Sequence, residues 1–253
     1  GNAREINAAG TVGYGKTIGL GASLSYNKLS NEIHAYLAGG TLMKHSTGGT
    51  IDLDVLAENQ GKLYAFGANA AVSSDAEGLG ALSEAVIGEA EDSEGQVSSR
   101  EKTSLSDVSD ASVRAESRGM RLAVVGNVDA SMGKAAIGGA VAYNDVGGAG
   151  TGKAGQKTRA AIVNASLASS DGGKVSVQAK DASTLTTVAV GIGGAKTAAI
   201  EGAAATALVN KAITSEIKNS EMKAASGRMQ ETSVSSESGS KIVTTAVAGA
   251  GSG

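Results

Sequence analysis

The stretch Gly19–Asn27, GLGASLSYN, decides how this chain is interpreted, because similar phrases return later in the sequence. The related phrases are Gly78–Val86 (GLGALSEAV), Ile137–Asp145 (IGGAVAYND) and Glu201–Asn210 (EGAAATALVN). Their glycines Gly21, Gly80, Gly139 and Gly202 recur at nearly equal intervals. The period of about 60 residues predicts a stacked array, in which each repeat buries its apolar side chains against its neighbours.

A second phrase repeats with the same period. It occurs at Leu63–Gly67 (LYAFG), Leu122–Gly126 (LAVVG), Thr187–Gly191 (TVAVG) and Thr245–Gly249 (TAVAG). The final glycines of these phrases are again separated by about 60 residues each time. We therefore treat residues 1–253 as one β-solenoid segment with four repeats, at approximately 10–67, 68–126, 127–191 and 192–249.

Short stretches inside the repeats alternate apolar and polar residues, which is the period of a β-strand. In Lys174–Lys180 (KVSVQAK), the side chains of Val175, Val177 and Ala179 share one face. The stretches around Leu53 and Val113 follow the same pattern at similar positions of repeats one and two. Ala81–Ala90 and Lys211–Ala225 also tolerate a helical period, but glycines in the repeated phrases and β-branched residues elsewhere favour strands.

A repeat of about 60 residues divides into three coils of about 20 residues each around a triangular core. This division predicts an all-β, right-handed parallel β-helix (β-solenoid) of about 12 coils. The glycine-rich stretch Gly147–Gln156 (GGAGTGKAGQ) resembles an insertion, and we expect residues 147–156 to project as a loop from one corner.

The composition indicates a core of small side chains, since aromatic residues make up 2% of the chain and glycine supplies 37 of its 253 residues. The absence of cysteine excludes disulfides, thiolate catalysis and cysteine-based zinc sites. No basic stripe with interleaved aromatic residues is present, so nucleic acid is not an expected partner. No apolar run is long enough for a membrane-spanning helix, and Gly1–Gly10 lacks the pattern of a signal peptide.

Gly10–Thr17 (GTVGYGKT) fits the phosphate-binding P-loop pattern at every required position. That chemistry needs a buried strand before the loop and a helix after it, and the flanking sequences predict neither. The Gly-Lys pair also returns at Gly133-Lys134, two periods later. We therefore assign the match to a turn of the repeat and expect no nucleotide cofactor.

Other short motifs favour structural roles. The tripeptide Leu53-Asp54-Val55 resembles an integrin-recognition sequence, but the alternation sends Leu53 and Val55 inward and exposes only Asp54. His34 and His45 have no acid or nucleophile at a suitable spacing for a metal site or a catalytic triad. We expect the repeated asparagines to occupy left-handed corners and to stack as amide ladders: Asn27, Asn144 and Asn210. Asn164-Ala165-Ser166 fits a glycosylation pattern that arises often by chance, and an acidic run at 89–94 is interpreted as a solvated loop rather than a calcium site. No catalytic, cofactor-binding or metal-binding residue is assigned, and we expect the chain not to be an enzyme.

Several of these stretches resemble a known family. Ile137–Asp145, Arg159–Gly193 and Glu201–Gly227 are similar to the repeats of filamentous-haemagglutinin-like and leukotoxin-family filamentous adhesins, which are very large bacterial surface exoproteins. The resemblance implies a right-handed parallel β-helix, type V or two-partner export by a Gram-negative bacterium, and a role in holding binding modules away from the cell. The family's secretion module and translocator barrel have no counterpart here, which fits an internal segment.

These observations predict a structural and adhesive stalk at the bacterial cell surface or in secreted form. Its expected partners are host-cell or bacterial receptors or matrix polymers, and virulence is the expected context. The breaks in the repeat, Glu84–Asp110 and Gly147–Gln156, are the expected contact surfaces, because binding surfaces differ where regular coil faces repeat. Two alternatives stay open: a filament subunit that assembles end to end, and a polysaccharide-active β-helix enzyme.

Overall fold

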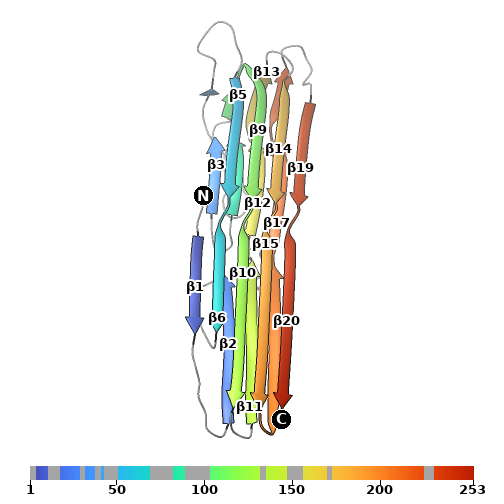
Figure 1. Cartoon of the computed structure of the whole chain (residues 1–253). Helices are drawn as coiled ribbons and strands as arrows, with labels where there is room; N and C mark the ends of the chain where they lie inside the picture. Colours follow the sequence, from blue (N-terminus) through green and yellow to red (C-terminus); the bar gives the residue numbers. More distant parts are fainter. Residues whose placement is uncertain are drawn as a thin grey trace.

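The structure is a computed structural model in which every described element is a β-strand (Figure 1). It describes residues 4–10, 18–28, 32–37, 41–42, 51–68, 82–88, 103–131, 135–146, 156–169, 173–224 and 231–253. The described strands form five sheets, which we call A to E, and every strand pairing between them is parallel. The all-β, parallel prediction is therefore confirmed.

The strands of each sheet, in the order of their pairing, are as follows. Sheet A contains β1 (Arg4–Gly10), β6 (Lys62–Ala68), β10 (Met120–Ser131), β15 (Thr184–Ala195) and β20 (Lys241–Ser252). Sheet B contains β2 (Ile18–Lys28), β11 (Ala135–Val146) and β16 (Ala198–Val209). Sheet C contains β3 (Glu32–Leu37), β7 (Leu82–Gly88), β12 (Gln156–Val163) and β17 (Lys211–Lys218). Sheet D contains β4 (Thr41–Leu42), β8 (Thr103–Leu105), β13 (Ala165–Ser169) and β18 (Glu221–Ala224). Sheet E contains β5 (Ile51–Asn59), β9 (Val108–Ser117), β14 (Lys174–Asp181) and β19 (Glu231–Ser238).

The chain passes through sheets B, C, D, E and A in that order and then begins again, an arrangement compatible with a β-solenoid; in the second passage no described strand belongs to sheet B. We call one such passage a coil. Val113 pairs with Val177, and Val177 pairs with Val234, so each partner lies one full repeat further along the chain. The expectation of three coils per repeat, about 12 in all, is therefore not confirmed. In sheets A, C, D and E, strands pair with strands about one repeat away, so each repeat makes a single wide coil. In sheet B, β2 pairs with β11, which lies two repeats further along the chain.

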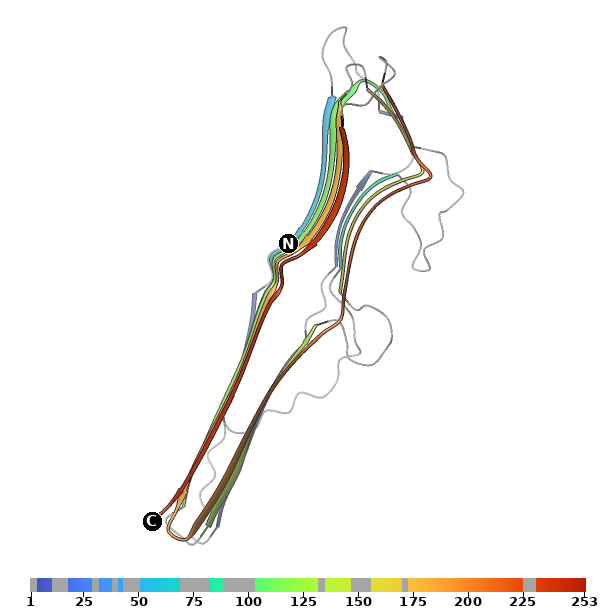
Figure 2. The same cartoon turned by 90° about the vertical axis from the view of Figure 1, so that its right-hand side faces the viewer.

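The coil is elongated and flattened, as a view turned by 90° shows (Figure 2). Sheets E and A follow one another along one long side, and sheets C and B lie on the other. Sheet A contacts sheet B through pairs such as β10 with β11, and sheet E contacts sheet C through pairs such as β14 with β12. The strands run along the long dimension, while the five strands of sheet A stack over only about 19 Å at the usual spacing between strands.

The alternating stretches noted in the sequence became the strands of sheet E. Val55, Val113, Val177 and Val234 lie side by side in four successive coils. Val113 and Val177 are fully buried, as the alternation predicts. The helical alternative is wrong, because Leu82–Gly88, Lys211–Lys218 and Glu221–Ala224 are strands.

The repeated phrases do not all align as their glycines suggest. Leu82 to Val86 pairs with Glu32 to Tyr36 in sheet C, so this part of the second GLGA-type phrase does not belong beside β2. Gly139 pairs with Gly202, as expected, but it pairs with Ala22 rather than with Gly21. In sheet A, Gly126 pairs with Val190, one residue before Gly191. Phrases made of Gly, Ala and Val match at several offsets, whereas alternation of the two faces fixes the register of a strand.

The interior contains two apolar cores along the long dimension. The larger lies between sheets C, D and E and includes Val113, Ile162 and Leu167. The second lies between sheets A and B and consists of alanines and one valine, including Ala123, Val125 and Ala142. Small side chains let the two sheets approach each other, which explains the low aromatic content.

Candidate functional site

The two apolar cores are separated by a band of buried polar residues at the corner where sheet E passes into sheet A. Asn59, Ser117, Asp181 and Ser238 occupy the same position in four successive coils. The first three are buried. The backbone N–H of Gly61 bonds the Asn59 side chain at 3.0 Å, and that of Ser183 bonds Asp181 at 3.0 Å. A short polar side chain at this position therefore closes the corner by a local hydrogen bond.

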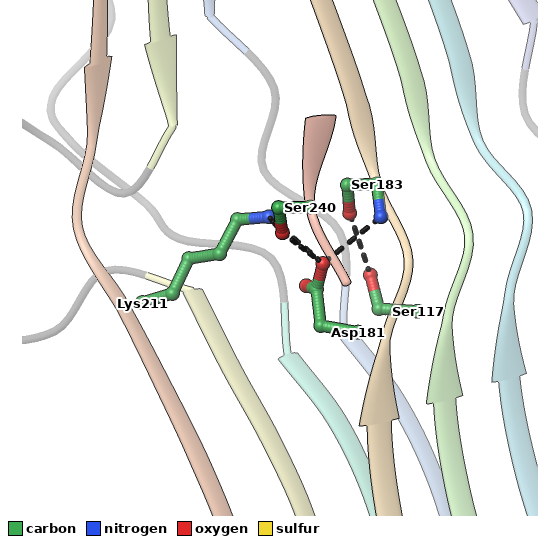
Figure 3. A network of polar contacts seen from close by, with 5 residues as sticks. All are labelled: Ser117, Asp181, Ser183, Lys211 and Ser240. Atoms are coloured by element: carbon green, nitrogen blue, oxygen red, sulfur yellow. Dashed lines mark hydrogen bonds and ion pairs between the residues drawn. The ribbon is translucent and has the colours of Figure 1, made fainter. Parts of the chain in front are cut away.

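Asp181 is also the centre of a network that crosses the interior (Figure 3). Lys211, the first residue of β17 on the opposite side of the coil, donates from Nζ to Asp181 Oδ1 at 2.9 Å. Ser240 lies at the same corner of the next coil; its hydroxyl donates to Asp181 Oδ1 at 2.8 Å and accepts from Lys211 Nζ at 2.9 Å. Both charged side chains are buried, with 0% of Asp181 and 7% of Lys211 exposed. The ion pair thus joins the two long sides of the coil.

Burial and hydrogen bonding act in opposite directions on the pKa of Asp181. Burial alone would raise it, but hydrogen bonds from Lys211, from the Ser183 N–H and from Ser240, together with the lysine charge, hold the pKa below its usual value. Burial lowers the pKa of Lys211, and the positive charge of Arg121 adds to this effect, while Asp181 opposes it. The carboxylate is the better stabilised of the two charges.

The chemistry of this cluster is that of a structural contact. A serine next to a lysine becomes a nucleophile when the neutral amine accepts the hydroxyl proton. Here Lys211 donates to Ser240, and Ser240 donates to Asp181. In the described part of the chain, no three His, Cys, Asp or Glu side chains gather as a metal site would require. The cluster therefore gives no support for a catalytic or metal-binding role.

Sequence reasoning missed this band. Arg121, which is fully buried, pairs with Leu63 and Leu185 on the inward face of sheet A. The run Leu122–Gly126 is apolar at nearly every position, so its alternation does not reveal which face is inward. The polar residues at the end of each sheet E strand were the available signal, because Asn59, Ser117 and Asp181 recur at a fixed distance after the aligned valines.

The outer face of sheet E is charged, and its charges link neighbouring coils. Arg114 contacts Asp54 at 2.8 Å, and Lys180 contacts Glu237 at 2.8 Å. Asp54 is exposed while Leu53 and Val55 pack against the core, which confirms the orientation predicted for this tripeptide. Asp54 therefore lies within a strand and not in a loop, and it already forms an ion pair with Arg114.

The asparagine prediction was right about the mechanism and wrong about the residues. Asn144 pairs with Asn27 within sheet B, but Ala207 takes the third position and Asn210 lies beyond the end of β16. Asn144 is buried inside β11 and donates to Thr187 Oγ1 at 2.8 Å. The left-handed non-glycine residues of the described chain are instead Asp107 (φ 58°), Asn164 (φ 51°) and Asn219 (φ 48°).

The two corner asparagines stack, because Asn219 Nδ2 donates to Asn164 Oδ1 at 3.1 Å. Asn164 is buried, with 6% of its surface exposed. Its backbone N–H and C=O bond the neighbouring coils, to Lys218 and Thr103. This environment favours a corner amide over a glycosylation acceptor.

Several predicted features lie wholly or partly outside the described residues. These are residues 11–17 of the P-loop match, His45, the acidic run at 89–94, residues 89–102 of the acidic stretch, and residues 147–155 of the glycine-rich stretch. Gln156 begins β12, and His34 lies in β3. β2 begins at Ile18, directly after the P-loop match, so a strand stands where nucleotide binding requires a helix.

Comparisons with known proteins do not add a family or a function. No protein-family model matches the chain, and neither the curated proteins nor the solved structures include a significant match. Within the described residues, no helix has the length and apolar character that a membrane crossing requires.

Proposed function

We propose that this chain is a structural and adhesive stalk segment of a large bacterial surface protein, of the filamentous-haemagglutinin-like type that its repeats resemble. One observation carries the proposal: in sheets A, C, D and E, successive repeats add equivalent parallel strands to the same sheet. A protein built in this way grows by adding repeats, each of which extends the stack by about 4.8 Å. Repetition of this kind suits a stalk that extends from a surface and holds binding segments at a distance from it.

The proposal includes a right-handed coil, which is the sense that parallel crossover connections adopt almost without exception. It also includes export by a type V route and display at the bacterial surface or in secreted form. The proposed partners are a host-cell receptor, a receptor on another bacterium or a matrix polymer. No residue is assigned a catalytic role in this proposal.

Regular faces of sheets B to E repeat from coil to coil, so the segments between strands are the proposed contact sites. Residues 89–102 and 147–155 cover the parts of the two breaks that lie between described strands. The test is to coat a surface with the chain and count attached cells or bacteria. Variants with either segment replaced by a Gly-Ser linker of equal length should keep the β-strand circular-dichroism signal and lose attachment. Unchanged attachment by the double replacement would contradict this assignment.

End-to-end assembly is a second candidate, favoured by the last coil. Val234 is 47% exposed and Ile242 is 49% exposed, while their counterparts one coil earlier, Val177 and Leu185, are fully buried. A further coil, from another repeat or another copy, would cover these inward-facing side chains. Negative-stain microscopy at rising concentration should show fibres if copies supply that coil. Particles of constant length would exclude assembly by this route.

A polysaccharide-active enzyme receives no specific support, since the acids of the described sheet E face are spread along it and engaged in ion pairs such as Arg114 with Asp54. Incubation with a panel of uronic-acid polymers tests this alternative. Release of unsaturated or reducing sugars would overturn the non-enzymatic proposal.

A further inference from the structure

The outer face of sheet A differs from the outer face of sheet E. Apart from Lys62 and Lys241, the outward positions of β6, β10, β15 and β20 hold only uncharged residues. The larger aliphatic and aromatic ones include Phe66, Val124, Val128, Val188, Ile192 and Val247. We call these positions the apolar face of sheet A. Sheet E, which continues the same long side of the coil, instead displays Arg114, Lys180 and Glu237 outward.

Side chains on this face are exposed rather than packed under another element. Val128 is 68% exposed, Ile192 53% and Val247 52%. Val128 and Ile192 are register partners in adjacent coils, and so are Val190 and Val247. These apolar side chains therefore lie beside one another on adjacent strands instead of forming isolated apolar spots. Contiguous apolar surfaces of this kind mark interaction sites on soluble proteins.

The size of the face suits a specific protein interface. Four strands at about 4.8 Å spacing and about ten residues of about 3.3 Å each give roughly 600 Å² of projected area. Two such faces would bury roughly 1,200 Å² in total, which is the lower end of the range for stable, specific interfaces. The cationic residues Arg4, Lys62 and Lys241 occupy one register row where the strands begin, and the remaining outward positions of β6, β10, β15 and β20 carry no charge.

We propose that the apolar face of sheet A is a self-association surface on which a second copy of this chain docks face to face. Flat sheets with aliphatic outer rows pack on one another at about 10 Å, with their strands turned by about 30°. A two-fold axis makes the same patch serve on both copies, so the association ends at two. Binding to a lipid surface is the competing outcome; the described face has no tryptophan, and its cationic residues lie only at the end where the strands begin.

The position of Gly126 offers a direct test. Gly126 lies outward on β10, the middle strand of sheet A, and a Cβ added there would meet no atom within 4 Å. The chain has no cysteine, so Gly126→Cys introduces a single thiol near the centre of the face. A bis-maleimide that spans about 10 Å should join two copies of this variant. Ser235→Cys, on the exposed outer face of sheet E, is the matched control and should stay uncross-linked at equal concentration.

Sedimentation velocity of the full chain from about 1 µM to about 1 mM should show a monomer-to-dimer transition. Ile192→Lys and Val128→Lys should each raise the dimer dissociation constant about a hundredfold, because each places a charge inside an apolar contact. Ser235→Lys should leave it unchanged. Circular dichroism and the thermal midpoint identify any variant that fails to fold.

Three results would overturn the proposal. They are a monomer at every concentration, a dimer that Ile192→Lys and Val128→Lys do not weaken, and flotation with phosphatidylcholine vesicles in place of dimer formation. End-to-end assembly is distinguished from lateral docking because it continues beyond two copies and does not depend on Ile192. The experiments can therefore refute end-to-end assembly and lateral docking separately.

Discussion

Gly126 and Gly191 end the same repeated phrase, yet the structure places them on opposite faces of sheet A. Gly191 faces inward, where an added Cβ would lie 2.6 Å from Glu201 Oε1 and 2.8 Å from the Gly202 carbonyl oxygen. Gly126 faces outward into open space. We predict that Gly191→Ala destabilises the protein and that Gly126→Ala stabilises it.

The magnitudes follow from what each methyl group meets. Glu201 cannot turn away freely, because its carboxylate accepts a hydrogen bond from Asn127 Nδ2 at 2.9 Å. The Gly202 oxygen belongs to the backbone of β16, so relief requires β15 and β16 to separate. Overpacking of this kind costs about 1–3 kcal/mol. At Gly126 the alanine only restricts the unfolded chain, which stabilises the folded state by about 0.4–1 kcal/mol.

The assay is thermal unfolding followed by circular dichroism, with hydrogen exchange to locate the change. The two variants should differ by about 2–3 kcal/mol, which corresponds to roughly 5–10 °C in a chain of this size. Backbone hydrogen exchange in β16 should become faster in the Gly191→Ala variant and should stay unchanged in the Gly126→Ala variant. Shifts of the same sign and size for the two variants would refute the register of sheet A, since they would mean that both glycines have equivalent surroundings.

Three other predictions concern the polar contacts. The pKa of Asp181 in the folded protein is below its unfolded value of about 3.9, so the ionised carboxylate contributes fully to stability above that value. This contribution is lost as the pH falls through the folded pKa. Asp181→Asn should therefore make the free energy of unfolding depend less on pH in the acid range. Asp181→Ala leaves Lys211 buried without its carboxylate and should lower the free energy of unfolding, measured by chemical denaturation, by about 3–5 kcal/mol. The double variant Asp181→Ala, Lys211→Met should recover much of that loss. Equal losses in the single and double variants would contradict a coupled pair. Asn219→Ala should destabilise more than Asn219→Gly, by about 1 kcal/mol, because only glycine accepts the positive φ of this corner without strain, and the reverse order in thermal midpoints would refute the corner assignment.

The sequence was most informative where inward and outward residues differ in polarity. In sheet E, valines alternate with Ser, Gln, Lys or Arg, and the strands, their orientation and their alignment between coils follow from that alternation. In sheets A and B most residues on both faces are Gly, Ala, Val or Ile. Similarity of phrases then matches equally well one residue out of register, and the predicted glycine alignments failed there.

The number of coils could not be predicted from the sequence for a different reason. The observed period is compatible with three short coils or with one wide coil, because local patterns predict strands but not their partners. The partner of each strand depends on where the whole coil closes, and in this protein the residues at the corners determine that closure. Asn164 and Asn219 turn the chain between sheets C and D, and the polar residues from Asn59 to Asp181 turn it between sheets E and A.

A wide, flat coil raises a problem that a triangular one does not, since two long sheets lined by alanine and valine can slide past each other with little change in buried area. Polar contacts that cross the interior oppose such sliding, and three of them join pairs of side chains on opposed sheets: Asn144 with Thr187, Asn127 with Glu201, and Lys211 with Asp181. Each is satisfied at one relative position of the opposed sheets, and displacement would leave buried polar groups without partners at a cost of about 1–3 kcal/mol each. The contacts therefore act on specificity more than on net stability, as buried polar residues do when they fix the register of coiled coils. On this argument, apolar replacement of all three pairs would retain much of the stability and lose the unique alignment of sheets A and B, which would appear as broadened backbone resonances in those sheets with an unchanged β-strand signal.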